Sequence, residues 1–220
     1  WSPRGDLIAF TARDERNVFD LFTVAVDGGK ITRLTQDQGT YNEEPTFAPN
    51  GRLIAFTSTR GGGSDLWVMT PDGSHQVWLS PGLLASPQGL AWSADGRTLY
   101  AADYARGPYA IDRDTRAVRR LRADDAALAG LDGLVLDPRD GTLIATQNGL
   151  RPGRVVRLRV DGDRVRSEIL LMNAPGLTEP TLGAIVDGAF VFVANAQWDA
   201  FDPKHPTRAV PTLLLRLPRR

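Results

Sequence analysis

The chain has 220 residues, no cysteine, and 26 basic residues against 26 acidic ones. The absence of cysteine excludes disulfides, thiol catalysis and thiolate metal sites. The balanced charge gives no overall field that favours nucleic acid or an anionic membrane, and no apolar run approaches the roughly 18 residues of a membrane span. We therefore expect neither a nucleic-acid partner nor a membrane-spanning segment.

A short motif recurs about every 45 residues along the chain. Each copy joins a short apolar run to a turn that contains glycine, and the copies stand at 1–10, 47–56, 92–100, 136–144 and 186–191. This period is typical of radially repeated four-stranded units. The sequence predicts an all-β fold, a β-propeller of four-stranded antiparallel blades. The single domain 1–220 divides into blades at approximately 1–43, 44–86, 87–130, 131–177 and 178–220.

Within each repeat, apolar runs bounded by turn residues predict the strands. The inner strands are expected at 45–48, 89–92, 133–136 and 181–186. In the second repeat the following strands are expected at 53–57, 65–70 and 76–79, and in the third at 98–102, 109–112 and 118–121. In the fourth they are expected at 143–146, 155–160 and 165–171, and in the fifth at 190–194 and 212–217. No segment predicts a convincing helix, and 124–130 would form a turn or two at most.

The first and last repeats are incomplete. The first lacks an inner strand apart from Trp1, and the last stops after its third strand. An open ring leaves a bare edge strand, which propellers normally avoid by pairing strands from the two chain ends. About four and a half to five blades are therefore expected, with truncation on the N-terminal side because Trp1 begins inside a repeat. Trp1 and Trp92 occupy equivalent positions and are expected in the core between blades.

The repeat also predicts a ring of polar side chains, because equivalent positions of successive blades surround one axis. The first set stands immediately before the inner strands, at spacings of 44, 44 and 47 residues: Glu44, Gln88, Asp132 and Glu179, with Glu43 as a substitute for Glu44. The second set stands in the loops between second and third strands, at the same face: Arg60, Asp103, Asn148 and Asn195. We expect both sets to converge on one channel mouth.

The residues expected at the mouth are carboxylates and amides, the hard oxygen donors that Ca²⁺ or Mg²⁺ prefers. Crowded carboxylates also raise one another's pKa unless a cation neutralises them. The alternative is structural: such residues satisfy amides at strand starts or hold channel waters. The longest irregular stretch, 195–210, adds Trp198, which would stack on a sugar or cap the channel.

Other catalytic arrangements find little support in the sequence. The two histidines are His75, on a predicted outer strand, and His205, in the long loop. A Ser-His-Asp triad would need His205 and a serine, yet no nucleophile-elbow motif is present. The glycine run 61–63 lacks the Lys-Ser/Thr of a phosphate loop and lies between two strands.

Two resemblances follow from the motifs. Residues 1–80 resemble the TolB-type propeller repeat, through EPTFAPNGRLIAF at 44–56 and DLWVMTPDG at 65–73. Residues 86–220 resemble the gluconolactonase/regucalcin superfamily and its NHL-like relatives, through PQGLAWSADG at 87–96, LDGLVL at 131–136 and EPTLG at 179–183. Both families are six-bladed, so the resemblance implies a propeller of the six-bladed type.

The second resemblance also implies a metal. Lactonase-type members hold a divalent cation at the top of the channel with carboxylates and asparagines from the starts of inner strands. By this resemblance Asp132 matches the metal-binding aspartate, and Gln88 stands where the family has asparagine. The implied metal ligands in this chain are Asp132, Glu179 and Gln88, and the implied cation is Ca, Mg, Mn or Zn.

We predict an extracytoplasmic binding module, periplasmic or secreted. Its top face would recognise a small polar molecule or a protein segment. The alternative is a metal-dependent lactone or ester hydrolase of the gluconolactonase type, with Asn148 completing the metal site and Asp103 or Asp199 as the base. The residues predicted to line the ligand site are Glu44, Gln88, Asp103, Asp132, Asn148, Glu179, Asn195 and Trp198.

Overall fold

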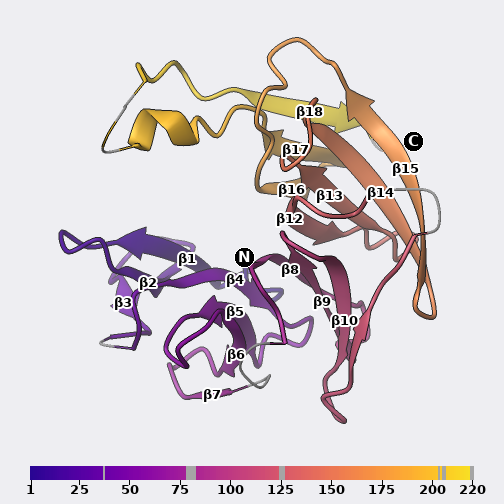
Figure 1. Ribbon diagram of the computed structural model, residues 1–220. Coiled ribbons are helices and arrows are strands. Elements are labelled where there is room, and N and C mark those ends of the chain that lie inside the picture. Colours follow the sequence, from indigo (N-terminus) through magenta and orange to yellow (C-terminus); the bar gives the residue numbers. More distant parts are fainter. Residues whose placement is uncertain (37, 78–82, 124–126, 203, 205–206, 219–220) are drawn as a thin grey trace.

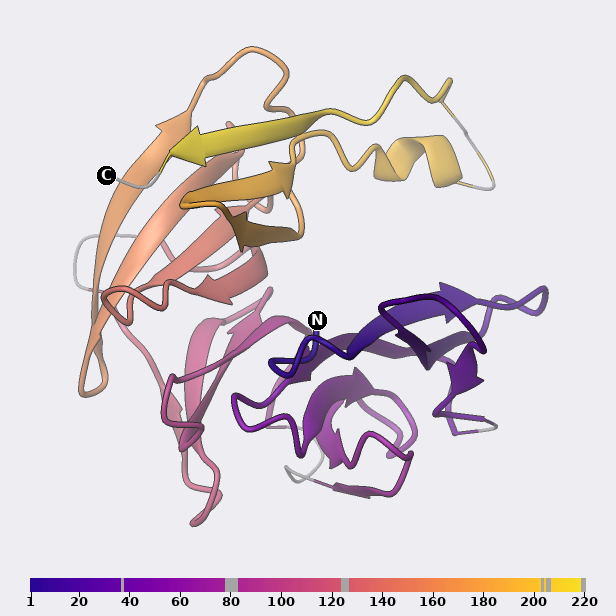
Figure 2. The same cartoon turned by 180° about the vertical axis from the view of Figure 1, so that it is seen from behind.

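The computed structural model describes all residues except 37, 78–82, 124–126, 203, 205–206 and 219–220 (Figure 1). The described residues form five antiparallel sheets that follow one another along the chain. Figures 1 and 2 show them side by side in an arc, with the first sheet (indigo) and the last sheet (yellow) on either side of its opening. The prediction of an all-β propeller is confirmed.

The sheets are strand meanders in which each strand pairs with the next. The first, here blade 1, contains β1 (Leu7–Arg13), β2 (Phe19–Ala25) and β3 (Thr32–Arg33). Blade 2 contains β4 (Asn42–Phe47), β5 (Ile54–Ser58), β6 (Asp65–Met69) and β7 (His75–Val77). Blade 3 contains β8 (Pro87–Trp92), β9 (Thr98–Asp103), β10 (Gly107–Asp112) and β11 (Val118–Arg120).

The last two blades complete the arc. Blade 4 contains β12 (Leu131–Leu136), β13 (Leu143–Gln147), β14 (Arg154–Asp161) and β15 (Arg164–Met172). Blade 5 contains β16 (Gly183–Val186), β17 (Ala189–Val193) and β18 (Leu214–Pro218). A 3-10 helix, η1 (Trp198–Phe201), lies in the long loop between β17 and β18, which extends from blade 5 toward blade 1 in both views. The predicted turns at 124–130 and the predicted strand at 76–79 fall partly outside the described residues.

The core lies between the blades. Strand side chains alternate between the two faces of a sheet, so each blade packs one face against the blade before it and the other against the blade after it. Four clusters of buried apolar residues result, and examples from them are Phe56, Leu99, Leu143 and Phe192. Trp92 packs in this core as predicted, at 4% exposure, whereas the same prediction for Trp1 is wrong because that side chain is 70% exposed.

The inner strands differ from the prediction in where they begin. β4, β8 and β12 begin before the predicted positions, because each contains a β-bulge that hides the strand's start in the sequence pattern. The register of β4 shifts between Glu43 and Thr46, that of β8 between Pro87 and Leu90, and that of β12 between Leu131 and Leu134. The fifth inner strand, β16, instead begins later than predicted, at Gly183.

Candidate functional site

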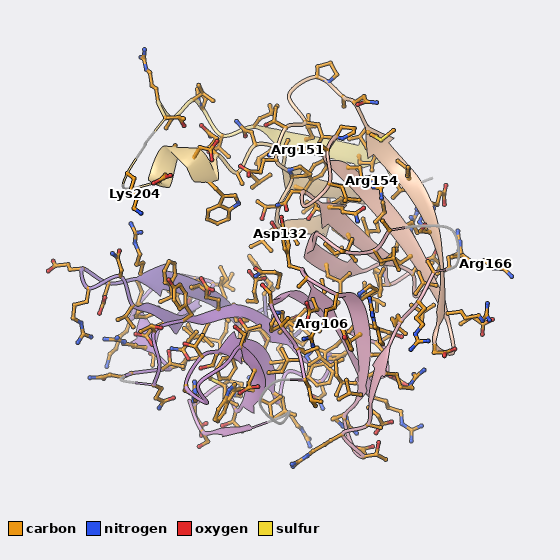
Figure 3. All side chains as sticks on the ribbon, viewed as in Figure 1. Arg106, Asp132, Arg151, Arg154, Arg166 and Lys204 are labelled. Atoms are coloured by element: carbon orange, nitrogen blue, oxygen red, sulfur yellow. The ribbon has the colours of Figure 1, made fainter. Side chains whose placement is uncertain are left out.

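Repeated bulges position the first set of predicted site residues. Glu44, Gln88 and Asp132 each lie inside the interrupted part of an inner strand. A bulge frees a residue from regular pairing and re-aims its side chain, so these three residues are aimed in the same way by successive blades. Figure 3 shows Asp132 at the inner side of the arc, whereas Arg166 lies on its outer rim.

A glycine follows both Gln88 and Asp132, and it lets neighbouring inner strands approach closely. A Cβ on Gly89 would lie 2.4 Å from the backbone nitrogen of Leu134 and 2.6 Å from the backbone oxygen of Asp132. A Cβ on Gly133 would lie 3.0 Å from the backbone oxygen of Thr181 in the next blade. Only glycine fits such positions without moving backbone. The close contact between the inner strands is what brings the side chains of adjacent blades together.

Two adjoining pockets occupy the mouth. One has a volume of about 350 Å³, the other about 370 Å³, and the side chains of Gln88, Asp132 and Trp198 line both. The first pocket also touches Asn148 and Glu179, and the second also touches Glu44 and Asn195. We call this group the mouth: Glu44, Gln88, Asp132, Asn148, Glu179, Asn195 and Trp198.

Most polar groups of the mouth already have partners within the chain. The Asn148 side-chain amide donates a hydrogen bond to Oδ2 of Asp132, which is 8% exposed. Nε2 of Gln88 donates to the Ser86 hydroxyl at 3.2 Å. Oε2 of Glu179 accepts a bond from the backbone N–H of Trp198 at 3.1 Å. The mouth is thus a preorganised network that fixes the directions of its carboxylates.

Burial raises the pKa of two acidic groups of the mouth, Glu44 and Asp132. It raises the pKa of Glu44 from 4.5 to about 8, and the nearby charges of Asp132 and Glu43 add to the shift. Burial also raises the pKa of Asp132, against the opposing hydrogen bonds from Asn148 and Thr181. Glu44 therefore holds its proton at neutral pH.

The raised pKa of Glu44 predicts that the free energy of unfolding depends on pH. Below about pH 4.5 the carboxyl is protonated in the folded and unfolded states, so its full contribution is present. As pH rises to about 8 the unfolded state ionises first, and on the order of 2 kcal/mol of stability is lost, since Glu44 is only partly buried. Urea unfolding at several pH values should show this slope, and Glu44→Gln should flatten it.

The control for this slope is Glu15→Gln, which changes an exposed carboxylate outside the mouth. It should keep the wild-type pH dependence. A Glu44→Gln variant with an unchanged slope would contradict the assignment of the shifted group.

Two residues of the predicted second set lie outside the mouth. Asp103 is fully buried, and its carboxylate accepts backbone N–H bonds from Ala85 at 2.6 Å, Ala105 at 3.0 Å and Arg106 at 3.1 Å. Arg60 stacks over Trp67 at 4.3 Å from the ring centroid, and burial lowers its pKa to about 10. Both side chains support the local turns of their blades and line neither pocket.

The long loop supplies the remaining predicted residues. Asn195 lines the second pocket, but its amide also donates to the backbone oxygen of Pro211 at 3.1 Å and accepts from the N–H of Leu213 at 2.6 Å. Trp198, the first residue of η1, is 59% exposed at the pocket rim. Asp199, one predicted base, is exposed and lines neither pocket.

The acidic side chains of the mouth bear on the divalent cation that the resemblance implies. Among the residues with assigned positions, no three His, Asp or Glu side chains are grouped to hold a metal ion. Asp132 is bonded to Asn148, and Glu179 to the backbone of Trp198. Asp132, Glu179 and Gln88 line one pocket, and a metal site formed by them stays a prediction.

The sequence reasoning missed Tyr104 and Ser86, which line the first pocket. Tyr104 is 37% exposed, and burial together with the charges of Asp132 and Glu179 raises its pKa. Its hydroxyl thus remains a proton donor at neutral pH. The available signal was position: Tyr104 follows Asp103 in a loop that was predicted to face the mouth, one residue away from the side chain chosen.

Within the described part of the chain, none of the helical segments has the length and apolarity needed to span a membrane.

Relatives of known name match parts of the chain. The Tol-Pal system protein TolB of Myxococcus xanthus is 77% identical over 69 residues, which are 31% of this chain and 16% of that protein. The chain therefore spans only a small part of this relative.

Solved structures share the fold. TolB from Acinetobacter baumannii aligns over 96% of this chain and 50% of its own, with a TM-score of 0.70 and 16% identity. A chain of a nidogen/laminin complex aligns over 88% of this chain and 69% of its own, with a TM-score of 0.69 and 20% identity. At these identities the likeness concerns the fold alone, a TolB-like propeller.

A family profile matches a longer part of the chain than the TolB relative does and identifies its family. The profile of the SMP-30/gluconolactonase/LRE-like region matches residues 21–195, most of the chain and every residue of the mouth except Trp198. This match confirms the resemblance to the gluconolactonase group, and the TolB relatives confirm the resemblance to TolB-type repeats. The chain belongs to the SMP-30/gluconolactonase/LRE-like family.

Proposed function

We propose that this propeller is a periplasmic or secreted binding module, whose mouth recognises a hydrogen-bond-donating ligand. The observation that carries the proposal is the convergence of Gln88, Asp132 and Trp198 on two adjoining pockets of the size that small ligands occupy. The likeness to Tol-Pal system proteins supports the location and a role in binding a partner.

The chemistry of the mouth favours a cationic group. Its pockets are lined by the acidic residues Glu43, Asp132 and Glu179 and by Glu44, which is protonated at neutral pH, and no basic residue is among their described lining. Trp198 adds an aromatic ring, which attracts an ammonium or guanidinium group placed over its face. The same chemistry serves a small amine or an arginine side chain of a protein segment.

Calorimetric titration with two probes tests this proposal. Putrescine represents a small amine, and arginine amide represents an exposed arginine of a protein segment. At least one of them should bind, and Asp132→Asn should weaken binding about 10- to 100-fold because a buried charged acceptor is lost. Trp198→Ala should weaken it about twofold to fivefold through loss of the ring contact.

The matched control is Asp199→Asn, which removes an exposed carboxylate beside Trp198 and outside both pockets. It should leave the affinity unchanged. Failure of both probes to bind the folded protein would refute a cation-recognising mouth. Fractionation of the producing cells tests the location, and a cytoplasmic protein would contradict it.

Cation titration separates the binding module from the alternative, a lactone or ester hydrolase. We expect Ca²⁺, Mg²⁺, Mn²⁺ and Zn²⁺ to give no heat that depends on Asp132, because the described acidic groups form no cluster for a metal. Asp103, one predicted base, already accepts three backbone hydrogen bonds. Cation binding that is lost in Asp132→Ala would favour the hydrolase and make lactone substrates the next assay.

A further inference from the structure

A second cavity lies between blades 4 and 5, lined by residues that do not line the mouth. Its volume is about 450 Å³, within the range of small-molecule sites. Apolar side chains from both blades line it, and Ile144 and Phe190, each 1% exposed, are the most buried of them. One of the two charged lining residues is the buried Arg157.

The strand registers explain the shape of this cavity. Ile144, Arg157 and Glu168 stand opposite one another across β13, β14 and β15. On blade 5, Phe190 of β17 stands opposite Leu217 of β18. The cavity lies between these two sets of facing side chains, and Pro218 at the end of β18 also lines it.

Arg157 is incompletely paired for a buried cation. The residue is 6% exposed, and its Nε is buried without a hydrogen-bond partner among the described residues. An ion pair joins Nη1 to Oε2 of Glu168 at 3.5 Å, longer than a charge-assisted hydrogen bond. Glu168 is itself 58% exposed in its side chain, so water weakens the pair. A buried donor left unpaired costs about 1–3 kcal/mol.

We propose that this cavity binds the carboxylate end of an amphipathic acid. The carboxylate would accept hydrogen bonds from Nε and a terminal nitrogen of Arg157, the fork geometry that guanidinium and carboxylate share. The aliphatic chain would lie against Phe190, Ile144 and Leu217. An alcohol would accept at most one neutral hydrogen bond from the guanidinium, without the charge assistance and the fork geometry of a carboxylate, and a cationic headgroup would be repelled by Arg157, so the site favours anions with an apolar tail. This inference is independent of the function proposed for the mouth.

Octanoate is the probe, with octanol as the uncharged control of equal chain length. Calorimetry should detect octanoate binding and much weaker octanol binding. Arg157→Gln should weaken octanoate binding about 10- to 100-fold, because hydrogen bonds to charged groups contribute about 1.5–3 kcal/mol. Glu168→Gln should tighten it about twofold to fivefold, because it removes a competing and repelling carboxylate.

Arg159→Gln is the matched control. Arg159 lies on the same strand two residues away, is exposed, and does not line the cavity. It should leave octanoate binding unchanged, as should Asp132→Asn in the mouth. Equal binding of octanol and octanoate, no octanoate binding, or equal losses in the Arg157 and Arg159 variants would each overturn the proposal. Because Glu168→Gln is expected to improve binding, a folding defect cannot imitate its effect, and weaker binding in it would also overturn the proposal.

Discussion

Replacing Gly89 by alanine is expected to destabilise the protein by about 3 kcal/mol or more. The new Cβ would lie 2.4 Å from the backbone nitrogen of Leu134 and 2.6 Å from the backbone oxygen of Asp132. These are main-chain atoms of β12 that cannot rotate away, so β8 and β12 must separate. Overpacking in a well-packed region costs about 1–3 kcal/mol where side chains can adjust, and more where backbone must move. Urea unfolding measures the loss.

The control is Gly63→Ala, at a glycine with no positive φ and no atom within 4 Å of the added Cβ. It should change stability by no more than about 0.5 kcal/mol. Gly89→Ala should also weaken ligand binding at the mouth, since Gln88 and Asp132 flank the contact. A Gly89→Ala protein as stable as the wild type would mean that the inner strands are farther apart than described.

Replacing Asp103 by alanine is expected to cost about 3 kcal/mol of stability without a specific effect on binding at the mouth. Its buried carboxylate accepts N–H bonds from Ala85, Ala105 and Arg106, and alanine leaves all three donors without that acceptor. Each lost bond contributes about 1 kcal/mol. Thermal or urea unfolding measures the change, and calorimetry with the mouth probes measures binding.

Asp103→Asn separates the contribution of the hydrogen bonds to stability from that of the side chain's packing. Its amide oxygen can keep the bonds to Ala105 and Arg106 on Oδ1 but loses the one from Ala85 to Oδ2, so an intermediate loss is expected. An Asp103→Ala variant that folds with normal stability but loses binding would instead return Asp103 to the ligand site.

The sequence predicted the repeat, the sheets and most of the mouth because these depend on spacing. Gln88 and Asp132 stand at equivalent positions of successive repeats, so their convergence follows from the symmetry of the blades alone. Asp103 and Arg60 also stand at equivalent positions, but the direction of a loop side chain depends on local partners. The carboxylate of Asp103 accepts hydrogen bonds from three backbone N–H groups, and the guanidinium of Arg60 stacks on an aromatic ring.

The bulges were not predictable for a similar reason. A bulge adds one residue to a strand and interrupts the alternation of apolar and polar residues, so the sequence pattern places the start of the strand after the bulge. The glycines at 89 and 133 were visible, but the backbone contacts that require them join different blades. The cavity beside Arg157 is lined by residues of two blades, and this too is a property of the assembled sheets.

The core is divided into separate clusters between blades, and this division affects how the sequence can evolve. Each cluster is built from two neighbouring blades, as in repeat proteins whose stability is roughly a sum of units and nearest-neighbour contacts. A substitution in one cluster is then compensated within the same pair of blades. Exchange of whole blades between related genes then requires only that the two new contacts between neighbouring blades pack well.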